Sequence, residues 1–299
     1  MKNKWLDLCV EIISEKINYN WGDIVSMKEF DFLAPHAYTI VGYAYSNEES
    51  SLLPYNKLVL LCNVLGYGFR CNGKYSISLE CYIKSISMQN SNLCQYSIYR
   101  STLYYNIAWL YDNLNDINSA IKWYQKDLMI CEALYGKEAV STAHTYNSLG
   151  VVYMKAQNYK KAMNFLKRAQ YIFRLYDDKC EIDLAAVYNN IANIYAKRNL
   201  YEQALHWYYK DIAISEKIIG KNHPDIAISY NNIGVTLYNM GDYFNALKWY
   251  EKALKIRCIF LNKDHPDLNL SINNAKKAYK KISEQRSSFN DWLRDVMKH

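Results

Sequence analysis

The chain has 299 residues, 51% of them hydrophobic, and a formal net charge of +7. Four prolines and ten glycines are few for this length, which favours long helices and argues against many short strands and turns. The eight cysteines form no CxxC pair and no zinc-finger spacing with histidine. They therefore predict buried free thiols in a reducing compartment, and exclude a dense disulfide framework.

The first 58 residues are expected to form an N-terminal helical segment. Residues 1–18 have the spacing of an amphipathic helix, a loosely patterned stretch follows through Trp21 and Phe30, and residues 37–45 and 55–69 are apolar enough for buried helices. Asp7 and Glu11 interrupt what would be the apolar core of a signal peptide, and no stretch is long enough to span a bilayer. We therefore expect a cytoplasmic protein without membrane contact.

From residue 101 the chain repeats itself every 42 residues. Each copy has two amphipathic patterns around a short break, such as Gly241-Asp242, which predicts a helix hairpin. Five positions keep their character through four copies: Tyr104, Tyr146, Tyr188 and Tyr230; Ile107, Leu149, Ile191 and Ile233; Ala108, Gly150, Ala192 and Gly234; Ala120, Ala162, Ala204 and Ala246; and Trp123, Phe165, Trp207 and Trp249. Internal repetition at this period indicates a solenoid, in which neighbouring hairpins complete one another's core.

The repeat pattern divides the remaining chain into three parts. Residues 59–100 are expected to hold a degenerate copy, residues 101–268 four regular copies, and residues 269–299 a capping helix followed by a short helix. The run Ser287-Ser288 is predicted to cap that last helix, which carries Trp292 and Val296. The tryptophans at the fifth repeated position are expected to pack in the core.

The motifs Tyr230–Ile233–Gly234–Leu237 and Tyr243–Ala246–Tyr250–Ala253 resemble the tetratricopeptide repeat (TPR), and the 42-residue period resembles its kinesin-light-chain variant. The linker Gly220–Asp225 returns as Asn262–Asp267, which supports this resemblance. It implies an all-α, right-handed superhelical solenoid of antiparallel helix hairpins whose first helices line a concave groove. In the linkers we expect Asp225 and Asp267 to cap the following helices, and His223 and His265 to serve the turn and not a metal.

Asparagines recur on the first helices, just before or beside the small residue. Asn is a mediocre helix former, so its repetition inside a helix needs a reason. One interpretation is that the amides bind the backbone of an extended peptide, as the resemblance implies; the other is that they hold neighbouring repeats together. The sequence leaves both open. The predicted groove residues are Asn106, Asn147, Asn189, Asn190, Asn193, Asn231, Asn232, Val235, Tyr238, Asn239, Asn273, Lys155 and Lys197.

The sequence contains no pattern typical of an enzyme: HExxH, GxSxG and GxxxxGK are all missing. We expect no catalysis, no cofactor and no metal. The basic cluster of Lys276, Lys277, Lys280 and Lys281 lies on the terminal capping helix instead of along the array, which argues against nucleic acid. The predicted function is a protein–protein interaction scaffold that binds a peptide segment or helix in its groove. The alternatives are a ligand-gated regulator resembling bacterial peptide-pheromone receptors and the scaffold subunit of a complex with a separate catalytic chain; self-association is left open.

Overall fold

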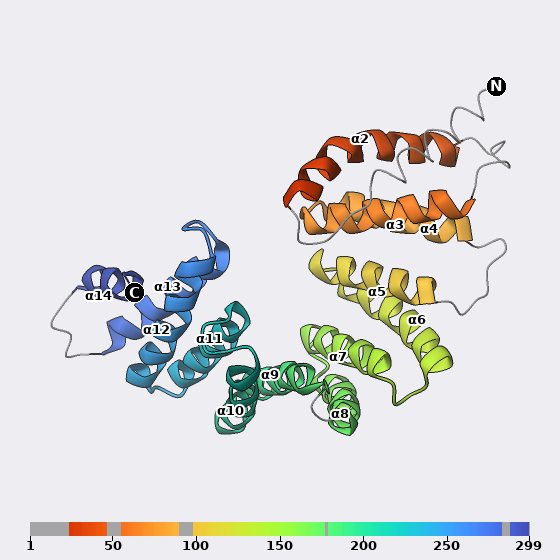
Figure 1. Cartoon of the computed structure of the whole chain (residues 1–299). Helices are drawn as coiled ribbons and strands as arrows, with labels where there is room; N and C mark the ends of the chain where they lie inside the picture. The colour runs from red at the N-terminus through yellow and green to blue at the C-terminus, as the bar shows by residue number, and fades with distance from the viewer. Residues whose placement is uncertain (1–23, 47–54, 90–97, 177–178, 283–287, 299) are drawn as a thin grey trace. The chain divides into compact units, whose positions relative to one another are not determined.

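The structure, a computed structural model, describes residues 24–46, 55–89, 98–176, 179–282 and 288–298. These ranges contain thirteen helices and no β-strand (Figure 1). The predicted all-α solenoid of antiparallel hairpins is confirmed. The chain divides into two compact units, residues 1–137 and 138–299, which are described separately. The helix predicted over residues 1–18 lies outside the described residues.

The first unit contains α2 (Ile24–Ser46), α3 (Tyr55–Cys71), α4 (Tyr75–Gln89), α5 (Ile98–Asn113) and α6 (Ile117–Tyr135). The loosely patterned stretch before residue 37 was not predicted as helix, but α2 begins at Ile24 and continues through Pro35. Phe30, Ala34, Ala37 and Val41 recur at helical spacing and are buried in one cluster with residues of α3. Tertiary burial of this stripe holds the helix across a residue that cannot donate a backbone hydrogen bond.

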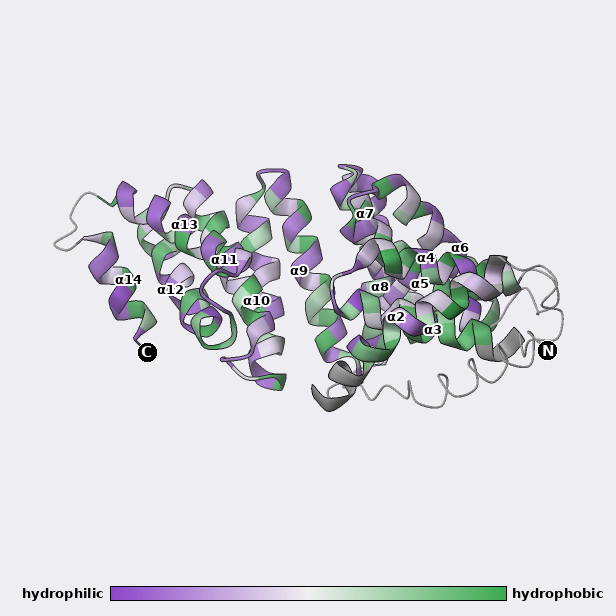
Figure 2. Ribbon diagram, turned by 90° about the horizontal axis from the view of Figure 1, so that it is seen from above, coloured by the Kyte–Doolittle hydropathy of each residue, from purple (hydrophilic) through white to green (hydrophobic). Residues whose placement is uncertain are grey.

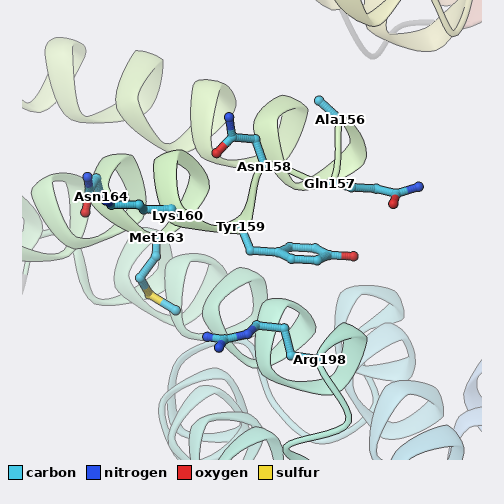
Figure 3. Close-up of a pocket in the computed structure, with 8 residues that line it drawn as sticks. All are labelled: Ala156, Gln157, Asn158, Tyr159, Lys160, Met163, Asn164 and Arg198. Atoms are coloured by element: carbon cyan, nitrogen blue, oxygen red, sulfur yellow. The ribbon is translucent and has the colours of Figure 1, made fainter.

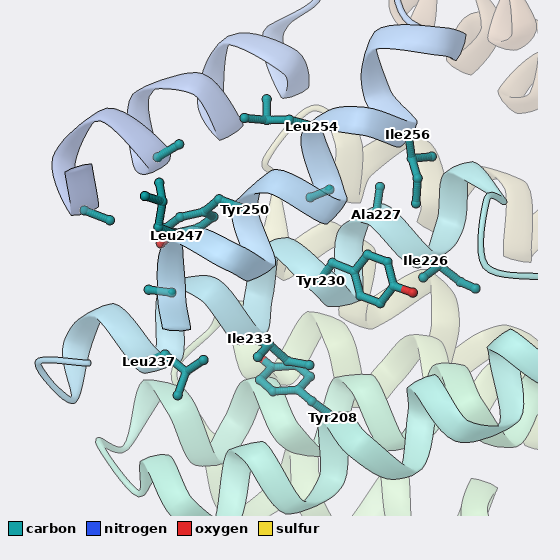
Figure 4. Close-up of a cluster of buried hydrophobic side chains, with 14 of the residues drawn as sticks. Tyr208, Ile226, Ala227, Tyr230, Ile233, Leu237, Leu247, Tyr250, Leu254 and Ile256 are labelled. Carbon is teal, nitrogen blue, oxygen red and sulfur yellow. The ribbon is translucent and has the colours of Figure 1, made fainter. Parts of the chain in front are cut away.

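The second unit contains α7 (Val140–Lys155), α8 (Tyr159–Leu175), α9 (Glu181–Lys197), α10 (Tyr201–Ile218), α11 (Pro224–Asn239), α12 (Tyr243–Phe260), α13 (Pro266–Lys281) and α14 (Phe289–Met297). Each second helix (α8, α10 and α12) packs against the first helix of its own hairpin and that of the next. Every helix carries hydrophilic and hydrophobic residues side by side (Figure 2). The hydrophobic ones meet in a cluster that runs from Ala192 to Val296 and includes Tyr208, Tyr230 and Tyr250 (Figure 4).

A small residue lets the two helices of each hairpin approach closely. A Cβ atom placed on Gly234 would lie 2.6 Å from Cε1 of Tyr250 and 2.7 Å from Cδ1. Gly66 stands in the same relation to Tyr82, at 2.7 Å from Cε1. Gly66 and Tyr82 align with this pair after whole steps of 42 residues.

Histidines, not aspartates, cap the two His-Pro-Asp helices. His223 Nδ1 accepts a hydrogen bond from the backbone N–H of Asp225 at 3.3 Å, and His265 does the same for Asp267 at 3.2 Å. Pro224 and Pro266 occupy the first helical turn, where a missing N–H costs nothing. The predicted capping role of the aspartates was therefore wrong. Both lie in the first turn of their helices, where a negative charge interacts favourably with the helix dipole.

The C-terminal helix closes the array. Ser288 caps α14, as predicted, and accepts a hydrogen bond from the N–H of Asp291. Phe289 and Trp292 pack around Tyr279 of α13, with ring centroids 5.5 and 5.9 Å from it, and Val296 is buried in the core of the unit. The short helix thus covers apolar surface that another hairpin would otherwise cover.

The described cysteines are all free thiols. Cys62, Cys81, Cys131 and Cys180 are buried, as predicted. Cys71 is exposed, which the prediction of buried thiols did not anticipate.

Substituting Gly234 by valine should lower the free energy of unfolding by about 2 kcal/mol, because the added side chain meets the buried ring of Tyr250. Urea unfolding followed by circular dichroism measures this. Gly234→Ala is the matched control. It should cost less, since Ala192 and Tyr208 hold the equivalent positions one repeat earlier; an unchanged free energy of unfolding in Gly234→Val would contradict the close approach.

Candidate functional site

The first helices of the second unit form one continuous face. Consecutive first helices (α7 and α9, α9 and α11, α11 and α13) approach each other more closely than consecutive second helices do. The layer of first helices is therefore on the inner side of the curve of this unit, and the second helices are on the outer side. We call the exposed side of α7, α9, α11 and α13 the inner face.

A buried carboxylate joins three helices behind the inner face. Asp211 on α10 is 3% exposed. Its Oδ2 accepts hydrogen bonds from Asn189 Nδ2 on α9 at 2.8 Å and from Ser229 Oγ on α11 at 2.5 Å, and its Oδ1 accepts one from Ser215 at 3.0 Å. Asn189 also donates to Ser229 at 2.9 Å. Burial raises the pKa of Asp211 above the usual carboxyl value, and the bonds from Ser229, Asn189 and Ser215 oppose that rise.

The repeats use different side chains at the equivalent position. Asp127 on α6 is buried too, and accepts a hydrogen bond from Ser101 Oγ on α5. In the last hairpin the position is Ala253, and Arg257 one turn later donates to Ser271 Oγ and to the carbonyl of Asp267 at 2.6 Å. Ser271 in turn donates to Asn231 at 3.0 Å. A polar connection between second and first helices thus recurs with different chemistry.

The asparagine pairs divide into two kinds. Asn189 and Asn231, the first members, bond to this buried network, and Asn231 is 6% exposed. The second members bond to the preceding first helix: Asn190 Nδ2 donates to Asn147 Oδ1 at 3.0 Å, and Asn232 Nδ2 donates to Asn193 Oδ1 at 3.4 Å.

The other predicted groove residues lie at different depths. Asn193 is half-buried; it donates to Asn189 at 3.1 Å and accepts from the hydroxyl of Tyr208 at 2.6 Å. Asn106 belongs to the first unit and accepts from Arg70 Nη1 at 3.0 Å. The remaining residues are half-buried or exposed, and their side chains take no part in the asparagine network described above: Val235, Tyr238, Asn239, Asn273, Lys155 and Lys197.

Sequence reasoning missed the carboxylate at the centre of the network. Asp211 falls at the repeated position that Ala169 and Ala253 also occupy. A charged residue at a small, buried position of a repeat was the available signal. It also missed Ile228 and Leu270, which lie one turn before Asn232 and Asn274 and are 50% and 51% exposed.

The repeated tryptophans are only half-buried. Trp249 packs against Tyr230 with ring centroids 5.3 Å apart, and Lys252 Nζ lies 4.0 Å from the Trp249 centroid. Trp207 has the same arrangement with Tyr188 and Lys210. The prediction of core packing holds in part: Trp207 and Trp249 pack against the core cluster, and a lysine also lies over each ring.

Hairpins of two helices repeated at a fixed period, each completing its neighbour, define an all-α repeat protein. Models of the tetratricopeptide repeat match residues 101–132, 142–169 and 183–284, which together make up more than half of the chain. The chain belongs to the tetratricopeptide repeat family, in the 42-residue form resembling kinesin light chain. Repeats of this family are generally non-catalytic interaction modules.

Solved structures share the fold at low sequence identity. BtubC (BKLC) from P. vanneervenii is 19% identical, with a TM-score of 0.58 over 95% of this chain and 96% of its own. A putative kinesin light chain from Podosopora anserina is 18% identical, with a TM-score of 0.53 over 68% of this chain and 96% of its own. The quorum sensor NprR from B. thuringiensis is 15% identical, with a TM-score of 0.62 over 98% of this chain and 74% of its own. Among curated proteins the sequence has no match.

The described residues lack two kinds of feature. Across the described helices, none combines the length and apolarity that crossing a membrane would require. In the same ranges, His, Cys, Asp and Glu side chains do not gather in groups of three or more that could hold a metal ion.

Replacing Asp211 by asparagine should change how stability depends on pH. Because burial raises the native pKa, the contribution of this carboxyl is complete below the ordinary pKa and is lost as the pH rises through the native value. The amide of Asp211→Asn keeps an acceptor for Asn189 and Ser229 without ionising. The variant should therefore gain stability relative to the parent as the pH rises through that window, measured by urea unfolding between about pH 4 and about pH 8.

Asp291→Asn in the same unit is the control with the opposite sign. Bonds with Ser288 hold the pKa of Asp291 below the usual range, so its contribution is present above the ordinary pKa and lost as the pH falls. That variant should lose stability relative to the parent as the pH rises. Parallel pH curves for Asp211→Asn and the parent would contradict the raised pKa of this buried carboxyl.

Proposed function

We propose that the inner face of the second unit binds an extended segment of a partner protein. The observation that carries this proposal is the spare hydrogen-bonding capacity of Asn190 and Asn232. Each uses one amide hydrogen to reach the preceding first helix, and within the described residues its side-chain oxygen and second amide hydrogen have no partner. One donor and one acceptor per repeat match what a peptide backbone offers.

Apolar side chains beside these amides supply a second contact. Ile228 and Leu270 are half-exposed and lie on the same side of their helices as Asn232 and Asn274, because residues four apart share a helix face. The half-buried Val235 lies two turns beyond Ile228. A bound segment would place its backbone along the amides and its apolar side chains against Ile228 and Leu270.

The two kinds of asparagine make the proposal testable. The amide of Asn189 donates hydrogen bonds to Asp211 and Ser229. Asn189→Ala should therefore lower the free energy of unfolding, because it leaves a buried carboxylate with one donor fewer. Replacing Asn190 or Asn232 by alanine removes only one hydrogen bond within the chain, at a half-buried position. Binding and stability should therefore separate between the two positions.

A peptide selected on the purified chain from a random display library, measured by isothermal titration calorimetry, provides the test. The double variant Asn190→Ala, Asn232→Ala should bind that peptide at least about tenfold more weakly, because backbone bonds at two repeats are lost. Its thermal unfolding should stay close to that of the parent. The exposed Gln203→Ala, on the second helix α10 and therefore outside the inner face, is the control and should bind as the parent does. Unchanged affinity in the double variant would sink the proposal and leave these asparagines a purely structural role.

The regulator and the scaffold-subunit alternatives use the same face but differ in their consequences. A regulator responds to a free peptide, so the selected peptide should alter the chain's association state or protease sensitivity. A scaffold subunit remains bound to a protein through purification, which mass spectrometry of the co-purified material detects. The first outcome would identify the ligand of the inner face as a free peptide, and the second as a stably bound protein.

A further inference from the structure

A second surface of the same unit combines a pocket with unpaired positive charge. The pocket lies at the turn between α7 and α8 and has a volume of about 810 Å³. It is lined by Ala156, Gln157, Asn158, Tyr159, Lys160, Met163, Asn164 and Arg198. None of these belongs to the predicted groove residues, so the pocket is separate from the asparagines of the inner face.

The pocket is built from two neighbouring turns. Figure 3 shows the turn of the second repeat and the first residues of α8 on one side, with Arg198, the residue that ends α9, reaching across toward Met163. Gln157 has a φ of 59°, which reverses the chain at the rim. The side chain of Asn158 accepts a hydrogen bond from the backbone N–H of Lys161 at 3.1 Å, so the N-terminus of α8 is already capped by its own chain. The charge and the hydrogen-bond donors of the pocket therefore come from its side chains and not from the N-terminus of α8.

The lining carries two positive charges and no carboxylate. Lys160 and Arg198 are exposed, and neither has an ion pair within the described part of the chain. The amides of Gln157 and Asn164 and the hydroxyl of Tyr159 add neutral donors around them. Such a set of donors and cations has its full charge available for an anionic ligand.

The charge pair is a departure from the repeat and not part of it. One repeat further on, the residues equivalent to Lys160 and Arg198 are Glu202 and Met240. Packing therefore does not require a cation at either position. The apolar positions of this repeat keep the common pattern, so the two cations are an addition to an otherwise ordinary turn.

We propose that this pocket binds a phosphate monoester carried on a protein segment. A phosphate monoester has a charge of about −1.5 to −2 at neutral pH, which two cations neutralise, whereas one carboxylate would leave a charge unpaired. The fork of Arg198 can hold two phosphate oxygens, Lys160 supplies a point charge, and the amides complete the donors. The volume leaves room for the residue that carries the phosphate, against Met163 and Tyr159. The proposal does not depend on the inner face.

The test uses the full chain and three short peptides, acetyl-Gly-X-Gly-amide with phosphoserine, serine or glutamate at X, in titration calorimetry. The phosphoserine peptide should bind about tenfold more tightly than the glutamate peptide, and the serine peptide should not bind measurably. In Lys160→Gln, Arg198→Gln the affinity for phosphoserine should fall by at least about tenfold. Equal binding of the glutamate and phosphoserine peptides, or no binding of phosphoserine, overturns the proposal.

Two controls separate a built site from general charge. The variant Lys167→Gln, Lys248→Gln removes the same charge from exposed positions outside the pocket and should leave the affinity unchanged; an equal loss there would show diffuse attraction and overturn the site. Inorganic phosphate should compete only weakly, because it lacks contacts to Met163 and Tyr159. If it binds as tightly as the peptide, the pocket takes free phosphate and the assignment to a protein segment is wrong. Asn190→Ala, Asn232→Ala should bind phosphoserine as the parent does, so failure of either proposal leaves the other intact.

Discussion

A hairpin of two amphipathic helices cannot bury both of its apolar stripes alone, and the rest of this structure follows from that constraint. In the second unit each second helix is held between two first helices, so every repeat supplies half of its neighbour's core. The small residue at Gly150, Ala192 or Gly234 sets how closely the helices of a hairpin approach, because a larger side chain would meet Leu166, Tyr208 or Tyr250. The same dependence explains α14. Among the described residues α13 is followed by the short α14 and not by a full second helix, and Phe289, Trp292 and Val296 of α14 cover part of the apolar surface.

Apolar packing alone does not fix how one hairpin sits on the next, because the same stripes recur in every copy. The polar network provides bonds that are specific to one pair of neighbouring hairpins. Asp211 accepts bonds from α9 and α11 together, and a buried carboxylate that loses a donor is costly, whereas a displaced leucine often finds another apolar contact. Its desolvation raises its pKa, so the junction has a cost in stability at neutral pH. Arg257 on α12 joins the following helix α13 through different partners, Ser271 and Asp267, which distinguishes copies whose cores are nearly alike.

The sequence predicted the fold class well because the fold depends on periodic apolar positions, and periodicity is visible without a structure. It predicted the start of α2 poorly, because Pro35 and an irregular pattern conceal a helix that tertiary burial stabilises. It assigned the caps of α11 and α13 to aspartate, because the sequence does not show that a histidine ring nitrogen two residues earlier accepts the backbone N–H of that aspartate. The asparagines were found from their repetition, but their division into an inward and an outward member depends on Asp211, which no pattern links to Asn189.

In a repeat protein, the residues at equivalent positions of different copies can be compared with one another. Where a residue recurs in all copies, packing is a sufficient reason for it, as for Ala246 and its equivalents. Where a polar residue recurs on the inner face, as at Asn190 and Asn232, it serves something common to all copies, and a peptide backbone is common to any bound segment. Where an exposed residue occurs in one copy only, neither packing nor the backbone of a ligand accounts for it. Lys160 and Arg198 belong to this last kind, because Glu202 and Met240 do equally well in the next turn. If both proposals hold, recognition that is indifferent to sequence falls on the inner face, and recognition of one particular group falls on the turn that departs from the repeat.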